Sequence, residues 1–324
     1  MRDDINEIIK RIDEQIDKIN EGVDSYVPNE VIINKVEMEM GDLQNDIEVI
    51  YNQYLVELNC LVGLDEVKNE IKKLVNYLIF IKKVGNKLNL GNFNLNMIFR
   101  GNPGTGKTTV ARIVAKILCQ LGFLENNKVI ETTPRDFIAG YVGQTAIKAK
   151  KTIESAKGGV IFIDEAYTFS KSTDENSHTF AHEAITEIIK EMETCNTAFI
   201  FSGYSKEMND FIDLNPGIKS RVAYDINFSN YTKDELFLMF SNKVERAGLN
   251  LNDDVKDILL EKIDNNMKSK NFGNGRMIDN LFNEILREHA SNNIYEVDEK
   301  ELLSIKKEDV INIKSKIEGG MYFG

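Results

Sequence analysis

The most constraining feature of the chain is the run Gly-Asn-Pro-Gly-Thr-Gly-Lys-Thr at residues 101–108, which has the spacing G-x-x-x-x-G-K-T. Apolar residues over 95–99 predict a strand that enters this run. The apolar residues after it recur at helical spacing, at Val110, Ile113, Val114, Ile117 and Leu118. A glycine-rich turn between a strand and a helix can direct backbone N–H groups at phosphate oxygens. The run therefore predicts a phosphate-binding loop within an α/β fold.

A second motif lies at residues 160–165, where Val-Ile-Phe-Ile predicts a buried strand and Asp164 and Glu165 follow it. An aspartate at the end of a sheet strand can hold Mg²⁺, and an adjacent glutamate can orient the attacking water. In the first motif, Lys107 can reach the β- and γ-phosphates and the Thr108 hydroxyl can ligate Mg²⁺. The competing explanations are a plain glycine turn and two acids that cap the following helix. Because both motifs occur together, we predict a nucleotide triphosphatase that uses ATP and Mg²⁺.

The phosphate loop supplies most of the residues that are predicted to bind the nucleotide. We expect Mg²⁺ to be held by Thr108 and Asp164, and the catalytic groups to include Lys107, Asp164 and Glu165. The loop residues are Asn102, Pro103, Gly104, Thr105, Gly106, Lys107, Thr108 and Thr109.

Composition argues against some classes of partner. The 324 residues are 42% hydrophobic and 28% charged, which is an ordinary globular balance. The net charge is −12, and the first 56 residues, with 14 acids and 5 bases, account for −9 of it. No basic stripe interleaved with aromatic residues occurs, so the sequence argues against nucleic acid as the main partner.

The cysteines and the apolar runs bear on location. Cys60, Cys119 and Cys195 are scattered and odd in number, which is typical of a reducing compartment. No run approaches 18 apolar residues and no apolar stretch follows the first methionine, so we expect neither a membrane span nor a signal peptide. The sequence therefore predicts a cytoplasmic protein.

The amino-terminal segment has its own pattern. Isoleucines recur at spacings of 4, 3, 4 and 3 from Ile5 to Ile19, and a second helical pattern follows Gly41. Residues 1–56 are therefore predicted to form an acidic helical hairpin. This hairpin either packs on its own chain or provides a docking or coiled-coil element for a partner.

Three further regions follow. Over 57–227, short apolar runs alternate with helical stretches, which indicates a doubly wound parallel sheet. Over 228–315 only helices are expected, beginning with a capping box at Thr232 and Glu235, so this region is predicted to be a small helical lid domain. A tail follows at 316–324. The predicted strands cover 96–100, 129–132, 160–164, 198–202 and 223–227.

Four segments carry a resemblance to a known family. These are Leu-Val-Gly-Leu-Asp-Glu-Val-Lys at 61–68, the phosphate loop and helix at 101–112, Ala-Gly-Tyr-Val-Gly-Gln-Thr-Ala at 139–146, and the strand and acids at 158–167. In motif and order they resemble the AAA+ ATPases related to CbbX and stage V sporulation protein K, over about residues 57–310. The resemblance implies a homo-oligomeric ring, usually a hexamer, in which ATP binds between subunits.

The resemblance assigns further site residues. Arg221 matches the arginine finger, which stabilises charge on the γ-phosphate bound by the neighbouring subunit, although a surface arginine at a helix end is the alternative. Arg276 matches the second sensor, which couples the γ-phosphate to the lid. Val62 and Gly63 fall where the adenine pocket of the family lies.

Two other assignments concern loops. Tyr141 and Val142 correspond to the loop that lines the central pore and grips an unfolded segment, whereas a buried tyrosine is the competing explanation. The first sensor is expected at the end of the strand over 198–202, and the sequence leaves Ser202 and Tyr204 open.

Departures from the family pattern are limited. Arg100 replaces a small hydroxyl residue before the phosphate loop, and His182 replaces a glutamine. His178 and His182 are four residues apart, but the glutamate of H-E-x-x-H is missing and no third ligand is evident, so a zinc site is not expected.

The function predicted from these patterns is ATP-driven remodelling of a protein partner by a ring that engages a segment through its pore. Two other classes remain open. One is a nucleotide-controlled switch or scaffold that contacts a partner through the amino-terminal hairpin, and the other is a nucleic-acid motor of clamp-loader or helicase type. No feature of the sequence identifies the client protein.

Overall fold

The computed structural model describes residues 55–84, 94–141, 143–170, 175–194, 196–269, 272–311 and 313. The predicted hairpin, apart from its last two residues, the tail over 316–324 and Val142 lie outside these ranges. Within these ranges, no helix is both long and apolar enough to cross a membrane.

The large domain is built on a five-stranded parallel sheet with the strand order β2-β3-β4-β1-β5. Strand β1 lies between β4 and β5, so that Phe99 is paired with Ser202 on one side and Ile226 on the other. The predicted parallel α/β sheet is confirmed, and the strand bounds differ from the prediction by at most one residue at each end. The strands are β1 Met97–Gly101, β2 Val129–Thr132, β3 Val160–Ile163, β4 Ala198–Gly203 and β5 Tyr224–Phe228.

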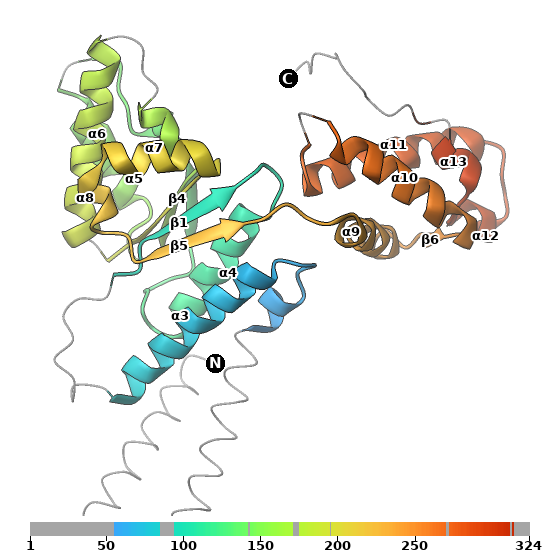
Figure 1. Cartoon of the computed structure of the whole chain (residues 1–324), viewed down its shortest axis with the longest axis horizontal. Coiled ribbons are helices and arrows are strands. Elements are labelled where there is room, and N and C mark those ends of the chain that lie inside the picture. The colour runs from blue at the N-terminus through green and yellow to red at the C-terminus, as the bar shows by residue number, and fades with distance from the viewer. Residues whose placement is uncertain are drawn as a thin grey trace, which may run out of the picture.

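Helices cover both faces of this sheet (Figure 1). Helices α3 and α4 pack on one face, and α5, α6, α7 and α8 contribute to the core on the other. Strand residues alternate between the two cores: Met97 and Phe99 belong to the first, and Ile98 to the second. Both faces are therefore apolar at the centre of the sheet, which explains why β3 and β4 read as continuous apolar runs, whereas the edge strands β2 and β5 include exposed polar residues. The helices are α3 Asp65–Val84, α4 Lys107–Gln120, α5 Thr145–Glu154, α6 Glu175–Thr194, α7 Ser205–Leu214 and α8 Pro216–Lys219, with short 3₁₀ turns at Pro134–Asp136 and Ala166–Ser170.

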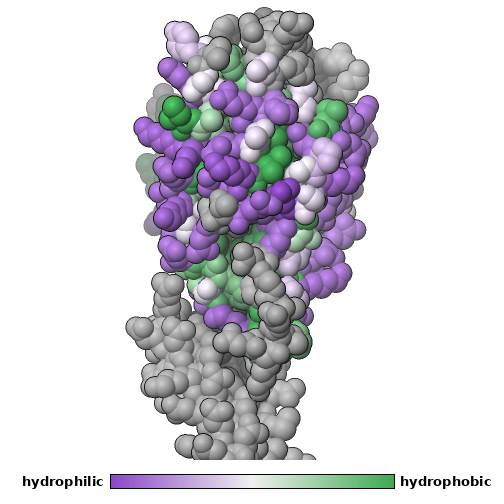
Figure 2. Space-filling model, turned by 90° about the vertical axis from the view of Figure 1, so that its left-hand side faces the viewer, coloured by the Kyte–Doolittle hydropathy of each residue, from purple (hydrophilic) through white to green (hydrophobic). Residues whose placement is uncertain are grey.

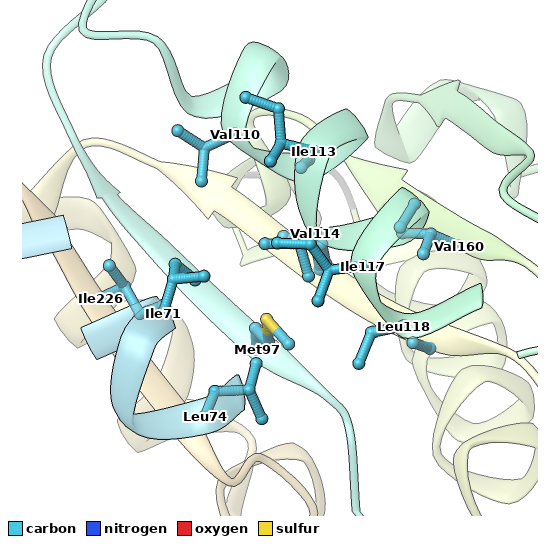
Figure 3. Close-up of a cluster of buried hydrophobic side chains, with 14 of the residues drawn as sticks. Ile71, Leu74, Met97, Val110, Ile113, Val114, Ile117, Leu118, Val160 and Ile226 are labelled. Carbon is cyan, nitrogen blue, oxygen red and sulfur yellow. The ribbon is translucent and has the colours of Figure 1, made fainter. Parts of the chain in front are cut away.

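Figure 3 shows part of the first core, in which the helix that follows the phosphate loop packs on the sheet. The apolar face predicted for α4 lies against the sheet, with Val114 and Leu118 close to Met97 and Val160. All four of these side chains are at most 1% exposed. The helix that begins at the loop is thus fixed on the sheet by its whole apolar face.

The lid domain follows β5 and is mainly helical. Helix α9 begins after Thr232, and the predicted capping box is confirmed, because Thr232 and Glu235 exchange hydrogen bonds. The expectation of no further strands is wrong: two short strands, β6 and β7, pair in parallel. Each has two residues, too few to show a period of two in the sequence. The lid elements are α9 Lys233–Arg246, β6 Asn250–Leu251, a 3₁₀ turn at Asp253–Val255, α10 Lys256–Met267, α11 Gly275–Asn292, α12 Glu299–Leu302, β7 Ser304–Ile305 and α13 Lys307–Ile311.

A buried polar pair fastens the last lid helix. His289 Nδ1 lies 2.8 Å from Asp309 Oδ2, and its Nε2 lies 2.9 Å from the Leu302 carbonyl oxygen. Burial favours a raised pKa for Asp309, but hydrogen bonds from the Lys306 N–H, Asn292 and His289 outweigh it and hold the pKa below its usual value. The carboxylate therefore stays ionised and holds α13 against α11.

Candidate functional site

A cavity of about 530 Å³ lies at the carboxyl ends of β1, β3 and β4, where the first turn of α11 and one face of α9 close it. Its two ends differ in chemistry. One is lined by apolar side chains, whereas the other contains the ammonium, carboxylate and guanidinium groups predicted to act on phosphates. The lining residues predicted from the sequence are Val62, Pro103, Gly104, Gly106, Lys107, Thr108, Thr109, Asp164, Glu165, Arg276 and, as one of the two first-sensor candidates, Tyr204.

The phosphate loop has the geometry of an anion cradle. Gly106 precedes α4 with φ 93°, a left-handed conformation that glycine adopts without steric cost. The Thr105 hydroxyl donates to the Asn102 carbonyl oxygen at 2.8 Å, which closes the turn from within. The first N–H groups of α4 consequently face the cavity at the positive end of the helix dipole. Asn102 and Thr105 shape the loop but do not line the cavity.

Lys107 bonds within the loop. Its Nζ donates to the carbonyl oxygens of Gly101 and Asn102, both at 2.8 Å. Burial lowers the pKa of Lys107 from 10.5 to about 8; Asp164 acts in the opposite direction and Arg276 adds to the lowering. The negative charge of a bound triphosphate would offset the cost of burying this ammonium.

The two acids are held by neighbouring strands. The backbone N–H of Asp164 donates to the Thr132 carbonyl oxygen on β2 at 2.8 Å, and Ser202 on β4 donates its hydroxyl to Asp164 Oδ1 at 3.0 Å. Glu165 has φ 50°, an uncommon value for a residue with a side chain, and its N–H donates to the same Asp164 oxygen at 3.0 Å. Asp164 therefore has a fixed position, and the more exposed Glu165 extends from it into the cavity.

The apolar end of the cavity suits a base. Val62 lies there with Leu61, Leu64, Met239 and Ile278. The neighbouring Gly63 has φ 58° and does not itself line the cavity. A Cβ atom on Gly63 would lie 2.1 Å from Glu235 Oε1, so a larger residue would have to move this side chain at the start of α9 in addition to adopting a positive φ.

The structure separates the two predicted arginines. Arg276 lines the cavity, whereas Arg221 does not. Arg221 Nε donates to Glu193 Oε1 at 2.9 Å, and a second nitrogen also pairs with Glu193. Its third nitrogen donates to the Gly217 carbonyl oxygen at 2.9 Å. Arg221 is thus presented away from the cavity of its own chain.

Tyr141 and Arg100 have defined surroundings. The side chain of Tyr141 is 73% exposed, which excludes the alternative of a buried tyrosine. Arg100 forms a two-pronged ion pair with Asp225, at 2.6 and 2.8 Å, on the α7 side of the sheet. Arg100, which departs from the family pattern, therefore belongs to a partly exposed ion pair outside the cavity.

The sequence reasoning missed several residues of the cavity. On α9, four lining residues recur at i, i+3, i+4 and i+7, a spacing that could have identified one face of that helix. Tyr167 also lines the cavity, and burial and then Glu165 raise its pKa to about 12, so it stays a neutral hydrogen-bond donor. The four α9 residues are Met239, Asn242, Lys243 and Arg246.

Comparison with known proteins gives the family. The family model described as "ATPase family associated with various cellular activities (AAA)" matches residues 97–230, and the AAA lid domain model matches residues 232–319. The chain belongs to the AAA family of ATPases. It is an enzyme that hydrolyses ATP.

Relatives are similar over most of their length. Stage V sporulation protein K of Bacillus subtilis (strain 168) is 33% identical, over 81% of this chain and 83% of its own. The chloroplastic ribulose bisphosphate carboxylase/oxygenase activase of Cyanidioschyzon merolae is 34% identical, over 78% of this chain and 87% of its own. These matches confirm the resemblance proposed from the four sequence segments.

Solved structures confirm the fold. The AAA domain of FIGL-1, crystallised in complex with ADP, superimposes with a TM-score of 0.53 at 15% identity and covers 79% of this chain and 84% of that domain. At this identity the likeness extends to the fold alone.

Proposed function

We propose that this ATPase works as a homo-oligomeric ring that remodels a protein partner engaged in its central pore. The observation that carries the proposal is the separation of two groups in one chain. Lys107, Asp164, Glu165 and Arg276 meet at the cavity, whereas Arg221 is held outside it. A guanidinium so placed can reach a triphosphate only on a second copy of the chain.

The residues have distinct roles in the proposed reaction. Glu165 orients the attacking water, and Lys107 and Arg276 bind the β- and γ-phosphates. Arg221 of the adjacent subunit stabilises charge that develops on the γ-phosphate. Thr108 and Asp164 would hold Mg²⁺, which neutralises phosphate charge when bound. The donor set fits this ion, because Mg²⁺ prefers oxygen ligands and both residues supply oxygen at the cavity.

Tyr141 is the proposed contact with the partner. Its ring is exposed on a loop between Gly140 and Gly143, and a Cβ atom on either glycine would meet nothing within 4 Å. A ring in so open a loop can contact an unfolded segment of varied sequence. The name of the Cyanidioschyzon merolae relative states that it activates another enzyme, which supports a protein as the partner here.

The remaining surface supports a localised contact. Figure 2 shows the large domain from the side on which α6 and α8 lie in Figure 1, and hydrophilic side chains predominate there, with separate hydrophobic residues between them. No broad apolar face is evident in this view, so a small exposed loop suits partner binding better than this face does. The cytoplasmic location inferred from the cysteine pattern stays a prediction.

The test uses Glu165→Gln. We expect this variant to bind ATP while its turnover falls by about 10²- to 10⁴-fold, as for loss of a general base. A ring arrested with ATP should retain its partner in a pull-down. Glu154→Gln, an exposed acid on α5, is the matched control and should leave turnover unchanged. Wild-type turnover in Glu165→Gln would refute the assignment.

A second variant separates a motor from a nucleotide-controlled scaffold. Tyr141→Ala should keep basal ATPase activity and lose remodelling of the captured partner. Tyr295→Ala, which removes a lid tyrosine that is 93% exposed, is the control. If Tyr141→Ala remodels the partner as the wild type does, the pore mechanism is wrong and the scaffold function replaces it.

A further inference from the structure

Asn274, which lies directly before Gly275 at the start of α11, has a backbone conformation that is normally adopted by glycine. Asn274 has φ 49° and ψ −124°, and its side chain is fully buried. Residues with a Cβ atom rarely occupy this region, and they do so only where surrounding contacts hold them. Such outliers concentrate at functional sites, so the contacts of Asn274 are informative.

The Asn274 amide joins three parts of the chain. Its Oδ1 accepts the Tyr231 N–H at 3.1 Å, in the segment that connects β5 to α9. Its Nδ2 donates to the Pro103 carbonyl oxygen of the phosphate loop at 3.2 Å and to Asn230 Oδ1 at 3.0 Å. Asn230 Oδ1 also accepts Asn102 Nδ2 at 2.9 Å. One side chain therefore links the phosphate loop, the interdomain connection and the lid.

The adjacent backbone reinforces this link. The Gly275 N–H donates to the Gly104 carbonyl oxygen at 3.0 Å, so the first turn of α11 bonds directly to the phosphate loop. A Cβ atom on Gly104 would lie 2.1 Å from the Gly273 carbonyl oxygen. Tyr231 adds a hydrogen bond from its hydroxyl to the Thr105 carbonyl oxygen at 3.3 Å. The lid and the loop are thus in backbone contact beside the cavity, which Gly104 and Gly275 both line.

We propose that Asn274 is a positioning residue that couples nucleotide binding at the phosphate loop to the orientation of the lid. It contacts no phosphate in this role. Instead, its hydrogen bonds keep the loop and the start of α11 together, and Arg276, two residues further on, is consequently held at the cavity. The coupling is reciprocal, so a lid that leaves this position must weaken nucleotide binding by the same factor. The inference rests on the phosphate loop being the nucleotide site.

The test compares substitutions that separate strain from bonding. Asn274→Gly removes the side-chain hydrogen bonds and suits the backbone conformation, whereas Asn274→Ala removes the same bonds and keeps a Cβ atom there. We therefore expect Asn274→Gly to melt at a higher temperature than Asn274→Ala, the reverse of the usual order within folded elements. A higher melting temperature for Asn274→Ala would show that the backbone is not held under strain.

The coupling itself is read by hydrogen exchange with and without ADP. In the wild type, ADP should slow exchange both in a phosphate-loop peptide and in a peptide from the start of α11. In Asn274→Gly, the slowing should persist in the loop and disappear from α11, and the dissociation constant for ADP should rise about tenfold, or ~1.4 kcal/mol. Unchanged protection of α11, with a dissociation constant within about twofold of the wild type, would overturn the proposal.

Two controls keep the outcome interpretable. Asn292→Ala removes a lid amide that donates to Asp309 at 2.7 Å and has no contact with the phosphate loop, so it should lower lid stability and leave ADP-dependent protection of α11 in place. Lys107→Ala should abolish ADP-dependent protection in both peptides, because it disables the nucleotide site. Retained protection in Lys107→Ala would refute the site, whereas loss in Asn274→Gly of α11 protection alone supports the coupling.

Discussion

Nucleotide binding should be linked to proton uptake through Lys107. In the free protein, burial lowers the pKa of this lysine to about 8. Bound phosphates supply negative charge that favours the ammonium, so the complex keeps the proton to a higher pH. Between the two pKa values the complex holds more protons than the free protein, and the affinity must therefore fall as pH rises.

The magnitude follows from the fraction of Lys107 that has lost its proton. With a pKa of about 8, this fraction is about 0.1 at pH 7, about 0.5 at pH 8 and about 0.9 at pH 9. The same fractions are the protons taken up for each nucleotide bound. The association constant should fall about tenfold from pH 7 to pH 9, which corresponds to ~1.4 kcal/mol.

The measurement is calorimetric titration with a non-hydrolysable ATP analogue in pairs of buffers that differ in ionisation enthalpy. The difference in observed heat gives the protons taken up at each pH. The triphosphate itself contributes little above pH 8, since a phosphate group loses its second proton near pH 6.

A matched pair of variants assigns the proton. Lys116→Arg changes a lysine on the same helix that is half-exposed and paired with Glu57, and it should retain the uptake. Lys107→Arg should abolish it, because a guanidinium stays charged throughout this range. Wild-type binding without proton uptake at pH 8 and 9 would refute the reasoning.

Three further outcomes are expected. Gly104→Ala should weaken ATP binding by tenfold or more in a fluorescence titration, because its Cβ atom would clash with the lid backbone. The control is Gly248→Ala, whose Cβ atom would meet nothing within 4 Å. This substitution strains only the backbone, at φ 75°, and ATP binding should be normal. Glu193→Gln should make assembly of active rings easier, because it frees Arg221 from a half-exposed ion pair. The protein concentration that gives half-maximal ATPase activity should therefore fall by about two- to fivefold. Asp309→Asn should lower the free energy of unfolding by about 2 kcal/mol in urea titrations, since it removes the buried carboxylate that His289 and Asn292 contact.

Local patterns in the sequence predicted the parts of the site that local chemistry determines. The central strands β3 and β4 are apolar on both faces, the phosphate loop depends on glycines at fixed offsets, and the capping box at Thr232 lies within four residues. Strands β6 and β7 were missed because two residues show no period. The cavity face of α9 was missed because its spacing acquires meaning only when the lid is placed over the loop.

Long-range contacts determined the rest. Asn102 and Asn230 are 128 residues apart, Asn230 and Asn274 are 44 apart, and nothing in the local sequence shows that their amides meet. The conformation of Asn274 likewise depends on these contacts, because a residue with a Cβ atom rarely adopts this positive φ unless its surroundings hold it there. The ion pair between Glu193 and Arg221 depends on the packing of α6 beside α8 and was equally invisible.

The positions of these groups indicate which half of the site can move during turnover. Asp164 is fixed to β2 through its N–H and to β4 through its carboxylate, so the acids cannot shift without breaking contacts between three strands. Arg276 stands on the first turn of α11, which meets the large domain through the Gly275 N–H and the Asn274 amide. Because a few hydrogen bonds of about 1 kcal/mol each break far more readily than a buried sheet, the motion that accompanies ATP turnover should occur in the lid. We expect the nucleotide to add a further contact between the two domains, beside the hydrogen bonds that the Asn274 amide, the Gly275 N–H and the Tyr231 hydroxyl make to the phosphate loop.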